Sequence, residues 1–523
     1  MTTEVVRPRL APWIVVHAPM ADGAPWIVER PGANPLRVSA DIGSLLSAVD
    51  GRRDVAALAG LLGTRWTPEL VGGAVRKLDD LGLLDGAPEP EPEKRVVWLS
   101  WTTVQFRLVR AARVLDPLRP LLVRLPGPVM IGLALLLALG GVGALVVLPL
   151  GDALGSPLPV EAAGWIWGGI VLTTVVHEFG HGATLTHYHG RPGWLGVMLF
   201  YLTPACFCEV TDGWRLGRRS QRVFVALAGV AVQTSVAGVA ALVALAVPAG
   251  DARTTLIGFA VVCYLSGAVN LLPFVKLDGY LALMAHLDIP RLRDRAISDA
   301  RGWLASGRRH ERDLPQRWVL PFGLVCLVFP VLVLALALSR WTHLLLGAGR
   351  VGGALVLLIV AALAYWAGRG LLRTTWTARL ASLAVAGGAV VVALLAFVPV
   401  RNDVQGGYVS NGTSVRLALP TGAAEVPVGA QVVLRRTGLV SGTDIGAATV
   451  DGRPQAGEVP LGAFLPFRSD TPAEALVVPL RGAVPPGVGA AHVVGEDVPL
   501  GTWLADNYLL PAWRQVFGQE GNR

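Results

Sequence analysis

The sequence predicts a mainly α-helical protein, a polytopic membrane bundle of about seven spans flanked by a small N-terminal domain and a small β-rich C-terminal domain. Hydrophobic residues make up 53% of the 523 residues and charged residues only 16%, with a mean hydropathy of +0.54. Soluble globular proteins usually carry about a quarter charged residues. Apolar runs of membrane-spanning length recur in the middle of the chain, so we divide it into 1–87, 88–125, 126–400 and 401–523.

Residues 1–87 are predicted to form a small soluble domain. Three short strand-like runs precede three helical patterns, and these elements lie at 13–17, 26–30, 36–39, 41–49, 54–62 and 68–84. The last helix opens with Thr67-Pro68-Glu69, which places a capping hydroxyl and then proline at the first helical position. The proline- and glutamate-rich stretch Ala87–Lys94 predicts a stiff polar linker after this domain.

Seven apolar runs predict membrane spans near 128–150, 163–184, 222–248, 254–275, 319–338, 344–367 and 380–400. The loops between these runs are alternately rich and poor in arginine, and only Arg350 fits the alternation less well. Because arginine-rich loops stay in the cytoplasm, this pattern predicts a multi-pass protein of the cell membrane. Its N-terminal domain is expected in the cytoplasm and residues 401–523 outside.

The net charge of +8 comes almost wholly from arginine, since lysine occurs only at Lys77, Lys94 and Lys276. Its placement between apolar runs indicates membrane topology, so we expect contact with membrane lipid and no nucleic-acid partner. The four cysteines lie in or beside apolar stretches, which does not suggest a disulfide framework. The first residues lack the apolar run of a cleavable signal peptide.

Residues 401–523 contain short β-type runs separated by glycine and proline turns, such as 415–419, 431–435 and 475–480. This pattern predicts a small extracytoplasmic β domain. A last amphipathic segment, Trp503–Phe517, is expected on that domain or on the membrane surface. This part of the chain carries no catalytic pattern.

The second apolar run contains His177-Glu178-Phe179-Gly180-His181. Histidines four residues apart share one face of a helix, so both imidazoles can reach one zinc ion. Glu178 beside them can accept a proton from water that the metal has made acidic. Such residues are costly in an apolar helix unless they serve a site, although a helix end that reaches water would also accommodate them.

A third protein ligand is needed, because a catalytic zinc ion keeps one position open for water. The fourth apolar run ends in Asn270-Leu271-Leu272-Pro273-Phe274-Val275-Lys276-Leu277-Asp278-Gly279-Tyr280. Pro273 and Gly279 break helices, so Asp278 is expected on irregular backbone at membrane depth, enclosed by protein or a water-filled cavity. The alternative for Asp278 is a helix C-terminal turn at the interface. The second and fourth runs cross in the same direction, so both motifs reach the same face.

The two motifs together resemble the site-2 protease (M50) family of intramembrane metalloproteases, whose signatures are HExxH and a motif of the type N-x-x-P-x-x-x-L-D-G. The resemblance covers about residues 160–300. Asn270, Pro273 and Leu277-Asp278-Gly279 keep the family spacing.

This resemblance implies roles for five residues. His177, His181 and Asp278 would bind one zinc ion, and Glu178 would be the general base. Asn270 would help to hold the substrate backbone, for which the alternative is a polar residue buried in the bundle. Two imidazoles and one carboxylate suit zinc, and iron or cobalt also accepts this set.

Residues 190–214, between the two motifs, are apolar but interrupted by glycine and proline. This stretch is too broken for a span, so we expect a re-entrant hairpin whose exposed strand edge pairs with an extended peptide and presents it for hydrolysis. It contains Cys206 and Cys208. One C-x-C without a second pair is a weak metal signal, and packing is the preferred interpretation.

The turn Val49-Asp50-Gly51 and the closing helix end Leu78–Leu84 give residues 1–87 a resemblance to PqqD-like peptide-recognition domains. These are winged-helix-like modules that bind the leader peptides of ribosomally made, modified peptides, and the leader adds as a strand beside a helix. A winged helix also suggests DNA binding, but Asp79 and Asp80 on the third helix would repel phosphate. A domain that only packs on the enzyme is the remaining alternative.

Through Glu209, Asp212, Trp214, Arg222 and the ALAG that follows, the chain also resembles bacterial peptide zinc metalloproteases, including the intramembrane metalloproteases of daptide biosynthesis. This implies a protease that removes the leader from a precursor peptide, with peptide-modifying enzymes or an exporter as further partners. Two alternatives stay open: a regulatory protease that cuts a membrane-bound transcription regulator, and a non-enzymatic export or self-immunity protein. The intact Glu178 argues against the second, because a binding site needs no base.

Overall fold

The computed structural model describes every residue except 1–6, 20–25, 31–35, 87–93, 101, 202, 309–315, 347, 421–425, 439–441, 466 and 519–523. The predicted linker Ala87–Lys94 therefore lies outside the described residues, apart from Lys94. The chain divides into two compact units. The first comprises Met1–Gly132, Thr174–Val232 and Asn270–Pro290, and the second comprises Leu133–Thr173, Gln233–Val269 and Arg291–Arg523.

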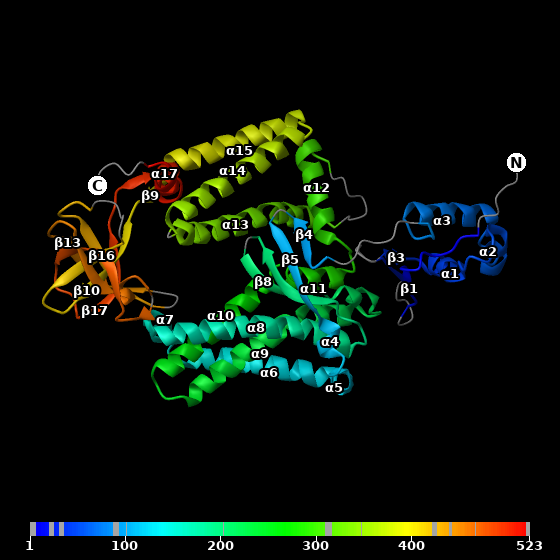
Figure 1. Ribbon diagram of the computed structural model, residues 1–523, viewed down its shortest axis with the longest axis horizontal. Coiled ribbons are helices and arrows are strands. Elements are labelled where there is room, and N and C mark those ends of the chain that lie inside the picture. Colours follow the sequence, from blue (N-terminus) through cyan, green and yellow to red (C-terminus); the bar gives the residue numbers. More distant parts are fainter. Residues whose placement is uncertain are drawn as a thin grey trace. The chain divides into compact units, whose positions relative to one another are not determined.

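The N-terminal part of the first unit is an antiparallel sheet of three strands followed by three helices (Figure 1). The elements are β1 (Val15–His17), β2 (Trp26–Glu29), β3 (Leu36–Val38), α1 (Ala40–Ala48), α2 (Val55–Leu62) and α3 (Pro68–Asp80). Ser39, Asp54 and Thr67 cap the three helices by accepting a hydrogen bond from a backbone N–H in the first turn. The last helix is shorter than predicted, because the chain turns at Gly82 with φ 67°.

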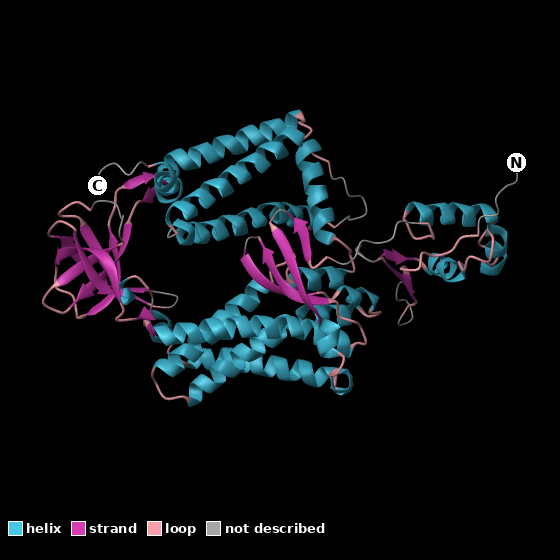
Figure 2. Ribbon diagram, viewed as in Figure 1, coloured by secondary structure: helices cyan, strands magenta, loops and turns pink. Residues whose placement is uncertain are grey.

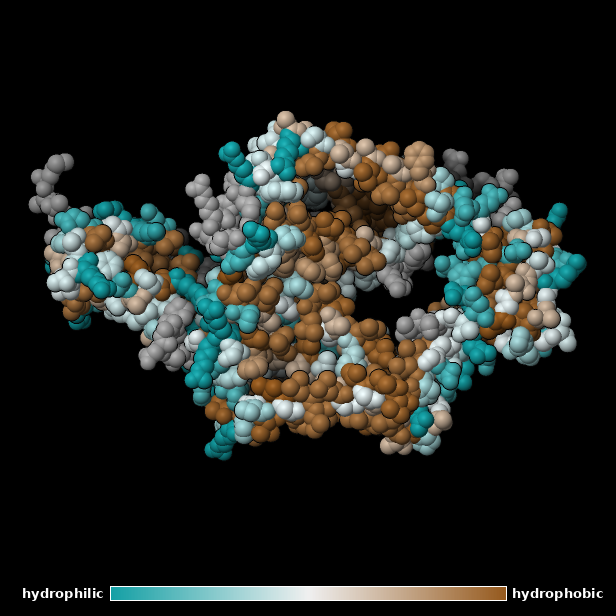
Figure 3. All heavy atoms as spheres, turned by 180° about the vertical axis from the view of Figure 1, so that it is seen from behind, coloured by the Kyte–Doolittle hydropathy of each residue, from teal (hydrophilic) through white to brown (hydrophobic). Residues whose placement is uncertain are grey.

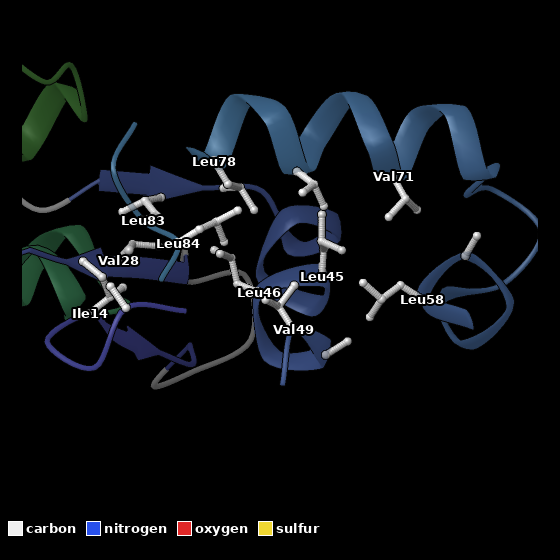
Figure 4. Packing of buried hydrophobic residues seen from close by; sticks show 14 residues of the cluster. Ile14, Val28, Leu45, Leu46, Val49, Leu58, Val71, Leu78, Leu83 and Leu84 are labelled. Carbon is white, nitrogen blue, oxygen red and sulfur yellow. The ribbon is translucent and has the colours of Figure 1, made fainter. Parts of the chain in front are cut away.

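A hydrophobic core closes within residues 11–84. Leu45, Leu58 and Val71 are fully buried and extend from α1, α2 and α3 into the same core, as Figure 4 shows. Each fully buried aliphatic side chain of this kind contributes about 2 kcal/mol to folding. These residues therefore have their own core, as a small domain requires.

The turn between α1 and α2 depends on Asp50. Its Oδ1 accepts hydrogen bonds from the backbone N–H groups of Arg52 and Arg53, at 2.9 and 3.2 Å. The Arg52 N–H is the main reason why the pKa of this carboxyl lies below its usual value. Gly51 has φ 78°, a left-handed conformation that strains other residues. The Val49-Asp50-Gly51 sequence thus has a physical role in the turn.

Seven helices among the described residues are long and apolar enough to cross a membrane, which confirms the predicted polytopic helical fold. They are α6 (Gly127–Val147), α8 (Val160–His187), α9 (Arg219–Ala246), α10 (Asp251–Asn270), α13 (Val319–Leu346), α14 (Gly349–Arg373) and α15 (Ala378–Phe397). Of the seven, α8 has the lowest hydropathy, 1.2 over its best window, and it is the helix with the HEFGH sequence.

The outer faces of these helices are apolar. On α15, for example, Val385 and Phe397 are 73% and 82% exposed. Figure 3 shows hydrophobic side chains over much of the helical part of the face drawn there. An apolar surface of this extent is unfavourable in water and suits lipid tails.

A four-stranded antiparallel sheet in the first unit joins two distant stretches of sequence (Figure 2). Its order is β4-β5-β7-β8, with β4 (Val96–Ser100), β5 (Thr103–Arg110), β7 (Trp194–Phe200) and β8 (Thr203–Cys208). The hairpin of β7 and β8 lies where the sequence predicts one, within residues 190–214. The sequence pattern does not predict that β5 pairs with β7, because pairing between strands so far apart leaves no local signal.

The C-terminal part of the second unit is a β-barrel, which confirms the prediction of β structure there. Its strands are β10 (Val404–Ser410), β11 (Val415–Leu419), β12 (Gln431–Thr437), β13 (Gly442–Val450), β16 (Pro472–Arg481) and β17 (Gly487–Val493), with β14 (Gln455–Pro460) beside β16. Because β11 pairs with both β10 and β16, the sheet closes on itself. The predicted strands 415–419, 431–435 and 475–480 fall on β11, β12 and β16.

Shorter elements connect these parts. They are α4 (Ala111–Leu115), α5 (Arg119–Arg124), α7 (Leu150–Gly155), β6 (Leu158–Pro159), α11 (Asp278–Leu287), α12 (Leu292–Ser306), β9 (Pro399–Arg401), β15 (Phe467–Arg468), β18 (Asp497–Pro499), α16 (Leu500–Leu504) and α17 (Leu510–Phe517). The predicted amphipathic segment Trp503–Phe517 is helical throughout. On α17, Gln515 donates a hydrogen bond to the carbonyl of Leu346, whereas Trp513 is 56% exposed.

Glycines allow α6 and α9 to pack closely in the second unit. A Cβ at Gly141 would lie 2.2 Å from the Cα of Gly238 and 2.4 Å from Oη of Tyr264. That Tyr264 hydroxyl donates to the carbonyl of Ala138 at 2.7 Å. Two residues further along α6, a Cβ at Gly143 would meet open space. Small residues at such crossings let membrane helices approach each other.

We expect Gly141→Val to destabilise the protein and Gly143→Val to have little effect. The first side chain has no room against α9, and overpacking of this kind costs about 1–3 kcal/mol. Thermal unfolding of the purified full chain in detergent compares the two variants. Equal melting temperatures for both would contradict the close helix contact.

Candidate metal centre

Helix α8 presents His177 and His181 on one face. The residues are four apart, and their Nε2 atoms lie 3.3 Å from each other. The two rings meet edge to face, with centroids 5.0 Å apart. Both side chains are buried, at 5% and 4% exposed. The helix therefore brings two imidazole nitrogens to one enclosed point.

Asp278 reaches the same point as the first residue of α11, so the irregular backbone that the sequence predicts ends at Leu277, one residue before it. Helix α10 ends at Asn270, and α11 begins at Asp278. The turn is tight, because a Cβ at Gly279 would lie 2.0 Å from the carbonyl oxygen of Leu271. Only glycine fits this approach, which explains the glycine after Asp278.

The Asp278 carboxylate spans both histidines. Its Oδ2 lies 2.9 Å from Nε2 of His177, and its Oδ1 lies 3.2 Å from Nε2 of His181. The three donor atoms lie within 4.8 Å of one another, and all three residues are buried. Oδ2 is buried without a well-formed hydrogen bond. A buried carboxylate oxygen of this kind fits coordination of a cation, so this cluster can hold a metal ion.

Helix α9 supports the two histidines from the other side. The Nδ1 of His181 lies 2.7 Å from the carbonyl oxygen of Val225. That carbonyl can only accept, so Nδ1 donates and Nε2 keeps its lone pair for a metal. One turn later, a Cβ at Gly229 would lie 2.3 Å from Nε2 of His177 and 2.4 Å from Nε2 of His181. Gly229 thus leaves the space in which a metal would bind.

Glu178 lies beside the cluster, partly buried. Its carboxylate interacts electrostatically with His177, His181 and Asp278, and it accepts a hydrogen bond from the backbone N–H of Cys208 on β8. A carboxylate next to a metal site but outside its ligand set is in the right place to exchange protons with a bound water.

Asn270 is the last residue of α10 and is partly buried. Its position before the helix break agrees with the motif spacing. None of the described contacts joins it to the three metal-site residues, so its role in substrate binding stays a prediction.

Cys206 and Cys208 are free thiols on the same side of β8. Burial, followed by the charges of Glu178 and Glu209, raises the pKa of the Cys208 thiol to about 12. A Cβ at Gly182 of α8 would lie 3.3 Å from its sulfur, so this thiol packs on the helix that carries the histidines. These observations support packing as the role of Cys208.

Arg222 and Asp288 join the ends of the two helices that complete the centre. Arg222 at the start of α9 is 6% exposed and donates to Oδ1 of Asp288 at 2.8 Å and to the carbonyl of Leu216 at 2.8 Å. Asp288 ends α11 in a left-handed conformation with φ 56°. Its Oδ1 also lies 3.1 Å from Nη1 of Arg37 on β3. Both arginines lie over the ring of Trp214.

Sequence reasoning alone does not identify the supporting roles of Val225, Gly229 and Asp288. Val225 acts through its backbone carbonyl, so its side chain carries no signal. Gly229, the last residue of the ALAG sequence, could have been found, because a glycine inside a helix often marks a close approach of another group.

Comparisons of this chain with protein-family models, with curated proteins and with solved structures gave no match. What the chain does has to be inferred from its own residues.

We expect His181→Ala and Asp278→Ala each to remove most of the bound metal, because three protein ligands are the minimum of a catalytic zinc site. Metal analysis of the purified full chain after equilibration with zinc should give about one ion per wild-type chain. His187→Ala is the matched control on the same helix, since His187 Nδ1 contacts the carbonyl of Leu122 instead. Equal zinc in wild type and His181→Ala would rule out the assigned ligands.

Proposed function

We propose that this chain is a membrane-embedded zinc metalloprotease of the site-2 protease type. The observation that carries the proposal is the buried cluster of His177, His181 and Asp278 with Glu178 beside it. The two histidines and Glu178 lie on α8, which is long and apolar enough to span a membrane, and Asp278 begins the short helix α11. Ionisable groups at membrane depth are costly and usually serve a site. The HExxH spacing adds a base to the ligands, which a site that only binds metal does not need.

The donor set suits zinc, because two imidazole nitrogens and one carboxylate leave a fourth position for water or substrate. When bound, the ion would supply Lewis acidity and lower the pKa of a water molecule to about 7. Glu178 would accept the proton of that water and return it to the leaving amine of the cleaved peptide bond. Val225 keeps His181 in one tautomer and one orientation throughout.

The hairpin edge supports a peptide as the substrate. Among the described residues, β8 pairs with β7 on one side only, and its backbone at Cys208 contacts Glu178. An extended peptide that adds to this edge would bring its backbone next to the base. Proteolysis requires an extended backbone, because a helix hides its peptide bonds in hydrogen bonds.

A precursor peptide is our preferred substrate, and leader removal our preferred reaction. Support comes from the N-terminal residues 11–84, which have their own core and a sheet that ends in β3. Arg37 on that strand contacts Asp288 at the end of α11, and α11 begins with Asp278. A leader bound at this domain would be held on the element that carries a metal ligand.

We place the active centre near the cytoplasmic face of the membrane. The alternation of arginine-rich and arginine-poor loops supports a cytoplasmic N-terminus and an extracytoplasmic β-barrel. The precursor would then meet the enzyme on the side where it is made.

Glu178→Ala is expected to abolish cleavage and to leave the zinc content unchanged, since general-base catalysis contributes about 10²–10⁴-fold. The assay would test the short peptides encoded by the neighbouring genes as substrates of the full chain in proteoliposomes, and would detect cleavage by mass spectrometry. Glu161→Ala is the control, because Glu161 is the exposed acid in the first turn of the same helix. Unchanged processing by Glu178→Ala would refute the protease mechanism.

A leader peptide should bind residues 1–87 and the full chain with similar affinity, because the strand edge and its helices belong to one core. Fluorescence anisotropy of a labelled leader from the neighbouring precursor gene measures both. A scrambled leader of the same composition is the control. No binding at high micromolar concentration would remove leader recognition and leave the protease proposal standing.

A further inference from the structure

The β7–β8 hairpin limits how a peptide can pair beside the metal centre. In this hairpin Cys208 lies opposite Leu195, Cys206 opposite Val197 and Pro204 opposite Leu199. In an antiparallel strand, successive backbone N–H and C=O groups point alternately to the two neighbouring positions. Only the residues whose backbone points away from β7 can therefore pair with a substrate.

The hydrogen bond of Glu209, the residue that follows β8, shows which β8 residues direct their backbone N–H and C=O groups toward β7. The backbone N–H of Glu209 donates to the carbonyl of Trp194, the first residue of β7, at 2.7 Å. Alternation then directs the backbone of Phe207, Ala205 and Thr203 toward β7. Cys208, Cys206 and Pro204 point outward. An outward proline is the arrangement that edge strands tolerate, since no ladder donor is lost.

Two of the three outward residues lack an available donor. The Cys208 N–H donates to the Glu178 carboxylate. Pro204 has no backbone N–H. Cys206 is the outward residue, among those described on β8, that offers both an N–H and a C=O.

We infer that an extended substrate pairs with β8 through a single two-bond exchange at Cys206, and that this single exchange fixes the register of the cleaved bond relative to Glu178. The inference rests on the proposed proteolytic function and adds the position at which the substrate is held. Cys206 acts here through its backbone, as a positioning residue.

This arrangement has a consequence for affinity and for specificity. A net peptide hydrogen bond contributes about 1 kcal/mol, so one exchange binds a peptide only weakly. A substrate that slips by two residues presents another of its own residues to Cys206 and makes the same two bonds. The exchange therefore fixes how far the paired residue lies from the cleaved bond, while most of the binding must come from elsewhere on the precursor.

Backbone variants of β8 test this inference with a quenched-fluorescence peptide that spans the cleavage site of the precursor encoded beside the gene. Cys206→Pro removes the outward N–H and should raise KM about tenfold or more, with kcat less affected. Cys206→Ala removes the thiol but keeps the N–H, and should stay within about twofold of wild type. Zinc content and melting temperature of each full-length variant confirm that the centre is intact.

Pro204→Ala is the gain-of-function arm, and it does not depend on a variant that might fold poorly. It adds an outward donor, so KM should fall about fivefold. An unchanged KM in Pro204→Ala, or equal KM values for Cys206→Pro and Cys206→Ala, would overturn the pairing at Cys206. Because wild type must cleave the peptide in every arm, loss of the register leaves the protease proposal intact. A wild type that cleaves nothing rejects both.

Discussion

The structure depends on one constraint: two imidazoles on the membrane-spanning helix α8 are buried together with the carboxylate that begins α11. Groups of this kind are stabilised at membrane depth only if they neutralise one another or share a cation. Neighbouring features follow from that requirement. The chain breaks after α10 so that Asp278 can turn inward, Gly279 permits the break, and Gly229 leaves room between the rings. The Val225 carbonyl holds the proton of His181 on the nitrogen that faces away.

The ligand residues are predictable from the sequence, whereas their supports are not. The two histidines can be predicted because they are four residues apart in a helical run. Asp278 can be predicted because it lies in a motif that breaks helices. The carbonyl of Val225 and the N–H of Cys208 are backbone groups that almost any residue would provide, so the sequence gives no sign of their roles. Their roles depend on how α9 and β8 are placed against α8, which is a property of the fold. Asp288 escapes prediction for the same reason, since its partners Arg222 and Arg37 lie far away in the chain.

The fold shows the same division between local and distant information. Hydropathy is a sum over neighbouring residues, so most predicted spans lie close to their helices. The boundary between the fifth and sixth spans is wrong, because α13 runs on to Leu346 and α14 begins only at Gly349. Single strands of the barrel, such as Val415–Leu419, are found from alternation alone. Closure of the barrel through β11 and β16, and the pairing of β5 with β7, depend on residues that only the folded chain brings together. Residues 88–125, which the sequence predicts as a linker, therefore contribute strands β4 and β5, which their composition does not predict.

The edge strand and the metal centre constrain each other through Glu178. A general base must be free to move a proton, yet it must be held where the substrate arrives. The Cys208 N–H holds the Glu178 carboxylate, so this N–H is not available to pair with a peptide at the edge of β8. Pro204 removes a second donor on the other side of Cys206. A longer ladder would bind any extended peptide more tightly, because each further exchange adds hydrogen bonds. The short ladder at Cys206 gives up that affinity, and a separate recognition domain is the natural means of restoring it.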